Sequence, residues 1–216
     1  TAQIVVALEA IDDNEPVIER HGDLLYLQLT TLSKDTVDQV KELLEAEKEK
    51  PLAERPKGLL LDLRGAIAAN PYAAALFMDL LFETGAGNYY ALRAQTAYNS
   101  HRFRPRSKNV DPKIPLVVLV NGGTEGSAEA MAAAIADLGR GIVVGSATGG
   151  LGRVYVGPML MNGGIFILTQ SMLQAAGGYG IQQRGILPMV CTSGLTTSAP
   201  LLARLRRGEG IIDYAS

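Results

Sequence analysis

The sequence predicts an α/β domain built around a mostly parallel sheet. Short, uniformly apolar runs at 59–63, 116–120 and 142–144 are typical of strands buried on both faces. Helical stretches alternate with these runs, and a β-α-β order implies right-handed crossovers between parallel strands. The chain has 216 residues, of which 47% are apolar, enough for one domain with a sizeable core. We therefore expect residues 1–216 to form a single domain.

The N-terminal region predicts three short strands followed by a helix. The strands are expected at 3–8, 16–20 and 24–30, because each run is apolar or alternating and is closed by turn-forming residues. The helix begins after Ser33, whose side chain is a suitable N-cap, and Pro51 ends it.

Two further helices are expected in the middle of the chain. The first spans 72–82, with Pro71 near its start, and the second is the Ala-rich stretch 127–138. Between them, residues 87–109 are rich in Tyr, Arg and Gln and show little apolar periodicity. We expect this segment to be a surface connection, with a lid or a partner-facing excursion as the alternative.

The C-terminal region predicts a hairpin and a short helix. Gly163 and Gly164 precede the apolar run 165–168, which indicates a turn leading into a strand. Residues 200–207 form a short amphipathic pattern with Leu201, Leu202 and Leu205 on one face.

Charge and composition exclude several classes of function. Lys and Arg number 20 against 22 Asp and Glu, so the formal charge of −2 favours neither nucleic acid nor an anionic membrane. A basic cluster at 102–108 is expected to be a solvated loop, with a contact to a peptide carboxylate or a partner as the lesser alternative. No apolar stretch is long and uncharged enough for a transmembrane helix.

Few residues are available to bind a metal ion. Cys191 is the only cysteine, so an intrachain disulfide and a cysteine-based metal site are both excluded. The two histidines, His21 and His101, lie far apart in the sequence, which makes a zinc hydrolase a poor interpretation. We expect no metal and no cofactor.

Residues 115–152 have the order of strands, turns and helix that is typical of a catalytic site, and we call this arrangement the frame. An apolar strand leads into a Gly-rich turn and the Ala-rich helix, and a second apolar strand ends in another tight Gly turn. This order places a turn residue at a helix N-terminus, where an attacking group would be exposed and amide donors for an oxyanion would be close.

The same segment resembles the C-terminal processing peptidases, or tail-specific proteases, of serine peptidase family S41. The family's block V-N-x-G-S-A-S-A-S-E aligns without gaps with residues 120–129, which read V-N-G-G-T-E-G-S-A-E. The strand K-G-L-I-L-D-L-R is similar to residues 57–64, and the segment S-I-Q-G-x-G-I-x-P to residues 180–188. The resemblance covers most of residues 20–190 and implies the ClpP/crotonase-like fold of the family.

The catalytic positions of the family are altered in this chain. The alignment places Gly126 at the serine nucleophile, Leu151 at the lysine base and Tyr155 at the glutamine that orients the base. The family's oxyanion loop N-N-P-G-G corresponds to residues 65–69, where Gly65, Ala68 and Ala69 stand. We assign these three residues, with Gly122 and Gly123, to the oxyanion and peptide-binding region.

One acidic position of the family is retained. Asp137 matches an acidic residue near the end of the helix that follows the nucleophile. Without catalytic partners, its carboxylate is expected to cap a local turn.

These departures predict an inactive pseudopeptidase that binds a peptide, a protein C-terminus or a partner protein. Glycine has no atom to attack with and leucine none to accept a proton, and losing such a unit lowers the rate by roughly 10⁴- to 10⁶-fold. The alternative is an active hydrolase that uses Ser127 with an unrecognised base, although Ser127 is expected to cap its helix. A crotonase-like acyl-CoA enzyme is a remoter alternative that rests on the shared fold.

The resemblance also carries expectations about the rest of the protein. Members of the family usually have a PDZ module upstream, and residues 1–22 are expected to be lead-in strands after such a module, which is either absent or trimmed away. The family implies a location in the cell envelope or periplasm, or secretion. A homo-oligomer is compatible with the resemblance.

Overall fold

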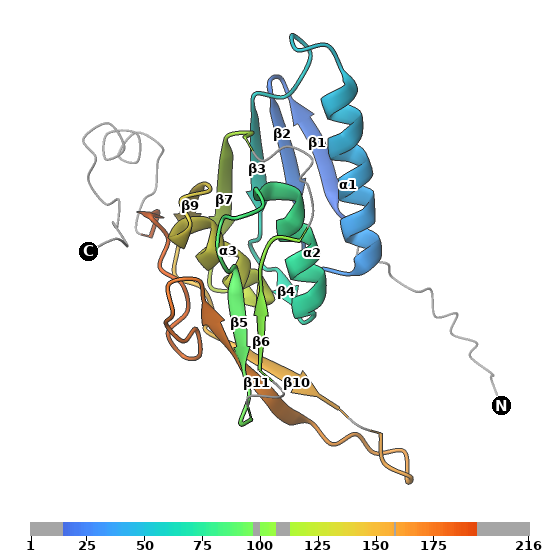
Figure 1. Cartoon of the computed structure of the whole chain (residues 1–216), viewed down its shortest axis with the longest axis vertical. Coiled ribbons are helices and arrows are strands. Elements are labelled where there is room, and N and C mark those ends of the chain that lie inside the picture. The colour runs from blue at the N-terminus through green and yellow to red at the C-terminus, as the bar shows by residue number, and fades with distance from the viewer. Residues whose placement is uncertain (1–14, 97–99, 107–112, 158, 194–216) are drawn as a thin grey trace, which may run out of the picture.

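The computed structural model describes residues 15–96, 100–106, 113–157 and 159–193, and its largest element is a six-stranded sheet (Figure 1). The strand order is β1-β2-β3-β7-β9-β12. Only β1 and β2 pair antiparallel, and the remaining neighbours are parallel. Their bounds are β1 Val17–His21, β2 Leu24–Gln28, β3 Gly58–Asp62, β7 Leu116–Val120, β9 Ile142–Gly145 and β12 Val190–Cys191. The predicted mostly parallel α/β sheet is confirmed.

Three helices are present in the described part of the chain, and two of them have the side-chain cap that their sequence suggests. They are α1 Lys34–Glu49, α2 Pro71–Leu81 and α3 Ser127–Asp137. Ser33 caps α1 by accepting a hydrogen bond from the Thr36 amide, and Asn70 caps α2 in the same way. All residues of α3 except the last are buried, because Ala side chains let neighbouring elements approach on every side.

The core lies between the six-stranded sheet and these helices. Leu25, Leu59, Leu116 and Val143 occupy successive strands and are almost fully buried. The registers pair Leu25 with Leu59 and Leu59 with Leu116, which places these side chains on one face of the sheet. The uniformly apolar strands β3 and β7 are therefore central, as predicted.

A second, four-stranded antiparallel sheet was not predicted. Its order is β10-β11-β5-β6, and its bounds are β5 Tyr90–Arg93, β6 His101–Phe103, β10 Arg153–Val156 and β11 Leu168–Ala175. The expectation of a surface connection at 87–109 is wrong for β5 and β6, since Tyr90 and Phe103 are buried and their rings lie 4.8 Å apart. Arg102, expected in a solvated loop, lies on β6.

The turn predicted at 163–164 is present. Gly163 has a φ of +81° and lies in the turn before β11, which confirms the turn at 163–164. The strand expected at 3–8 and the helix expected at 200–207 lie outside the described residues. None of the described helices has the length and apolar character needed to cross a membrane.

Candidate functional site

The N-terminus of α3 differs in one detail from the sequence prediction. Gly126, and not Ser127, is the N-cap residue of the helix, and Ser127 is the first helical residue. No side chain of residue 126 or 127 caps the helix; instead, a Glu129 carboxylate oxygen accepts a hydrogen bond from the Gly126 amide at 3.1 Å. The predicted Ser127 cap is therefore wrong, because the acidic residue at the third helical position takes over this function.

Gly126 has a backbone conformation that a side chain would not tolerate. Its φ is +66° and its ψ is −130°, outside the regions that L-residues favour. It lies in β8 (Glu125–Gly126), which pairs in parallel with β4 (Ile67–Ala68). A Cβ built on Gly126 would lie 2.8 Å from the Ala68 carbonyl oxygen. The position aligned with a nucleophile therefore has neither a reactive atom nor room for one in this conformation.

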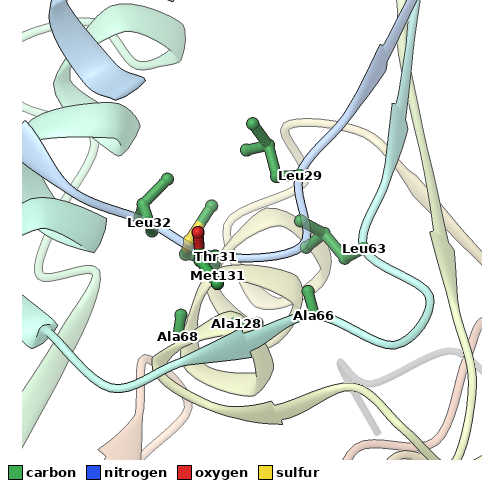
Figure 2. A pocket seen from close by; sticks show the side chains of 8 residues that line it. All are labelled: Leu29, Thr31, Leu32, Leu63, Ala66, Ala68, Ala128 and Met131. Atoms are coloured by element: carbon green, nitrogen blue, oxygen red, sulfur yellow. The ribbon is translucent and has the colours of Figure 1, made fainter. Parts of the chain in front are cut away.

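A small cavity lies beside this turn (Figure 2). Its volume is about 10 Å³, which is at most enough for one water molecule. Ala68 of β4, with Ala128 and Met131 of α3, lines one part of it, and Leu29 and Leu63 follow the carboxyl ends of β2 and β3. A substrate side chain does not fit into this cavity as it stands.

The buried Glu129 side chain connects the two turns of the frame. One carboxylate oxygen accepts hydrogen bonds from the Thr148 hydroxyl at 2.6 Å and the Gly150 amide at 2.7 Å. The other accepts from Gly126 and, at 3.4 Å, from the Gly152 amide. Glu129 is fully buried, so the carboxylate replaces lost water contacts with these donors. The turn before α3 and the turn before β10 are thereby held at a fixed separation.

The second turn holds the positions aligned with the base and its orienting residue. Leu151 is partly buried and lies between Gly150 and Gly152. Tyr155 lies on β10, is 44% exposed, and follows a β-bulge between Val154 and Tyr155. Thus the turn is present in the expected place, but it carries an apolar side chain where a proton acceptor would be needed.

The expected oxyanion region is occupied by internal hydrogen bonds. The Asn121 side-chain oxygen accepts from the Gly65 amide at 3.0 Å and from the Gly123 amide at 2.9 Å. A Cβ on Gly123 would lie 3.1 Å from the Gly65 Cα, so the two loops pack closely. Two amides that could have stabilised an oxyanion are therefore used to hold the loops together.

The remaining residues of the expected oxyanion region are structural or exposed. Gly122 packs against the second turn, since a Cβ on Gly149 would lie 3.0 Å from its carbonyl oxygen. Ala68 is buried in β4 and Ala69 is exposed after it. Glu129 and Asn121, which organise the site, were not singled out from the sequence, although a Glu three residues after a helix cap is a recognisable capping signal.

The Ser127 hydroxyl is buried and has no hydrogen-bond partner among the described residues. The side chain is 1% exposed. Four of the described lysines, Lys34, Lys41, Lys50 and Lys57, pair instead with carboxylates on or near α1 or β2. Within the described ranges, no base contacts the hydroxyl of this alternative nucleophile.

Asp137 at the end of α3 anchors a distant turn. Its carboxylate accepts from the Gly177 amide at 2.7 Å and from the Tyr179 hydroxyl at 3.3 Å. Burial raises the pKa of this carboxyl, and the two donors partly oppose the shift. The expected turn contact is therefore present, although the turn is remote in sequence and not local.

Comparisons with known proteins agree with this geometry. Residues 23–191 match the sequence family described as peptidase family S41. The carboxy-terminal-processing protease of Bartonella bacilliformis is 28% identical over 171 residues, which are 77% of this chain and 38% of that protein. The carboxy-terminal processing protease CtpA of Bacillus subtilis is 28% identical over 164 residues, 76% of this chain and 34% of that protein. The chain thus spans about a third of the length of these relatives.

Solved structures share the fold. The photosystem II D1 C-terminal processing protease superposes with a TM-score of 0.67 at 23% identity, covering 88% of this chain and 48% of that one. A lipoprotein from Streptococcus agalactiae also gives a TM-score of 0.67, at 20% identity, covering 93% of this chain and 71% of that one.

Proposed function

The chain belongs to peptidase family S41, and we propose that it is a member that binds a peptide or a partner protein without cleaving it. The relatives are named carboxy-terminal processing proteases, so the ligand class that fits the shared frame is an extended protein C-terminus. The proposal includes the cell-envelope or secreted location that the family resemblance suggests.

The conformation of Gly126 carries this proposal. A serine there would need a Cβ 2.8 Å from the Ala68 carbonyl oxygen, and Leu151 offers no proton acceptor. The Gly65 and Gly123 amides are bound to Asn121. Nucleophile, base and oxyanion donors are thus all missing or occupied, while the Glu129 contacts preserve the frame.

An active hydrolase based on Ser127 is the competing proposal. It would require the hydroxyl to leave its buried position and to find a base, because a serine nucleophile is weak without one. Each of the four described lysines near α1 and β2 would have to break an ion pair before it could serve as that base. We therefore favour the inactive alternative.

A fluorophosphonate probe distinguishes the two proposals. The purified chain is incubated with the probe and examined by intact-mass spectrometry, with Ser127→Ala as the matched variant and an unrelated serine hydrolase as the positive control. We expect no adduct on either form of this chain. An adduct on the wild type that disappears in Ser127→Ala would favour the active hydrolase and refute our proposal.

Ligand binding needs its own measurement. Fluorescence polarisation with a pool of labelled apolar peptides compares free C-terminal carboxylates with the same peptides as amides. We expect saturable binding that is weaker for the amides, and intact peptides by mass spectrometry after prolonged incubation. Equal binding of both forms would contradict recognition of a C-terminus, and shortened peptides would contradict inactivity.

A further inference from the structure

A hairpin arm projects from the second sheet beyond the rest of the described chain (Figure 1). We define the arm as residues 153–157 and 159–172, which include β10 and the first part of β11. Its outer part is held by its own backbone, with a bridge between Met159 and Ile165 and a hydrogen bond of 2.7 Å from the Leu160 amide to the Gly164 carbonyl. The arm is therefore an ordered hairpin whose outer side chains do not contribute to the core.

The arm exposes an unusual amount of apolar surface. Met161 is fully exposed, and Met159, Ile165, Phe166 and Ile167 are each more than half exposed. A soluble monomer rarely exposes a contiguous apolar patch larger than a few hundred Å² unless the patch binds something. A stable protein interface needs roughly 800 Å² from each partner, which large side chains along a whole hairpin can supply. The exposed apolar side chains of the arm are therefore typical of a surface that binds another molecule.

The charge pattern indicates what kind of partner fits. Residues 154–183 contain no Asp, Glu, Lys or Arg, although charged residues make up 19% of the chain. In a symmetric dimer, residues near the twofold axis face their own copies, and any charge there would meet a like charge. Apart from Arg153 at its base, the arm carries no charge and avoids this repulsion. It offers no charge for a complementary partner of another kind.

The edge of the four-stranded sheet that is unpaired among the described residues also favours a second copy of this chain as the partner. In the described part of the four-stranded sheet, β10 is an edge strand, paired with β11 on one side. Edge strands offer backbone donors and acceptors that a second strand can satisfy. A second β10, running antiparallel across a twofold axis, would add one strand partner to each copy and cover the apolar side chains next to it.

A lipid surface fits the arm less well. Segments that lie at a membrane interface usually combine apolar residues with Lys, Arg or Trp. The arm has no lysine and no tryptophan, and its single arginine, Arg153, lies at its base. The formal charge of −2 for the chain adds no attraction to anionic lipid.

We propose that the arm is the interface through which two copies of this chain form a symmetric dimer, with β10 edges and the apolar side chains beyond them packed together. This inference is independent of whether the chain cleaves peptides. It assigns the exposed apolar residues of the arm to the dimer contact, and it places the contact directly after the turn that contains Leu151.

Sedimentation equilibrium of the full chain tests the proposal. The wild type should shift from 22.9 kDa towards twice that mass as its concentration rises. The double variant Met161→Asp with Phe166→Asp should raise the dimer Kd by about 100-fold or more, because it places two charges inside an apolar contact. Leu52→Asp is the matched control: Leu52 is 81% exposed but lies between α1 and β3, so its variant should dimerise like the wild type.

Hydrogen exchange on the wild type keeps the test valid if the charged variant fails to fold. Amides of Arg153–Val156 should exchange more slowly at high protein concentration than at low concentration, because a second strand covers them. A wild type that stays monomeric up to about 100 μM, or a dimer that the arm variant leaves intact, would overturn the proposal. Binding of the monomer to neutral phosphatidylcholine vesicles through the arm would overturn it in favour of a lipid contact.

Discussion

Replacing Gly126 with alanine should destabilise the fold much more than the same replacement at Gly139. The two glycines flank α3 and have nearly identical φ values of +66° and +65°. At Gly139 a new Cβ would meet no atom within 4 Å, whereas at Gly126 it would lie 2.8 Å from the Ala68 carbonyl oxygen. The positive φ costs about 1 kcal/mol at each site. At Gly126 the unfavourable ψ and the backbone overlap add about 1–3 kcal/mol.

Urea unfolding measures this difference directly. Because the chain has no tryptophan, far-UV circular dichroism is the suitable probe. Gly139→Ala should lower the free energy of unfolding by about 1 kcal/mol and Gly126→Ala by about 3 kcal/mol, with unchanged m values. If both variants lost the same stability, the turn before α3 would be able to open for a side chain. The steric argument that this turn has no room for a side chain at position 126 would then fail.

Three further predictions concern Glu129, Ser127 and Asp137. Glu129→Ala should destabilise the fold by about 3–5 kcal/mol in urea unfolding, because it leaves the buried Gly126, Thr148 and Gly150 donors without their acceptor; a loss below about 1 kcal/mol would contradict the proposed link between the turns. Ser127→Ala should be neutral or stabilise by up to about 1 kcal/mol in the same assay, since the buried hydroxyl has no partner among the described residues, and a clear loss would reveal a hydrogen bond there. For Asp137, burial raises the pKa of the carboxyl in the folded state above its ordinary value of 3.8. The folded state therefore binds this proton more tightly than the unfolded state does. The resulting contribution to the free energy of unfolding is fully present below pH 3.8 and is lost as the pH rises through the folded pKa. The free energy of unfolding of Asp137→Asn, measured from pH 3 to 7, should lack this contribution, and a pH profile parallel to the wild type would exclude it.

Local sequence patterns were sufficient to predict most strands of the six-stranded sheet and the helices that pack beside it. The runs that form β3 and β7 are buried on both faces, so they are uniformly apolar and easy to recognise. The α1 cap at Ser33 depends on residues within one turn of each other. Such signals need no knowledge of the tertiary structure.

The second sheet could not be predicted in the same way. The strands β5 and β6 have four and three residues, too few for a visible alternation. β5 pairs with β11, far along the chain, and β6 pairs with β5. Their buried side chains include Tyr90 and Phe103, residue types that also occur in loops. Tertiary contacts, not local sequence, make these residues strands.

The candidate site, too, could be predicted only in part from the sequence. Alignment of the turn identified residues 126 and 151, but it could not show which groups occupy the amides around them. Asn121 binds Gly65 and Gly123, and Glu129 reaches Gly150, through contacts between segments distant in sequence. The one-residue error in the cap of α3 has the same cause, because Glu129 serves both its own helix and the second turn.

The hydrogen bonds of Glu129 stabilise the two turns of the site without involving the side chains at positions 126 and 151. The two turns that carry the positions aligned with the nucleophile and the base are joined by the Glu129 carboxylate, which accepts hydrogen bonds from both. Replacements at the reactive positions therefore leave the supporting bonds in place, whereas a replacement at position 129 would loosen both turns together. The stability of this region of the fold therefore depends on position 129 more than on the residues at positions 126 and 151.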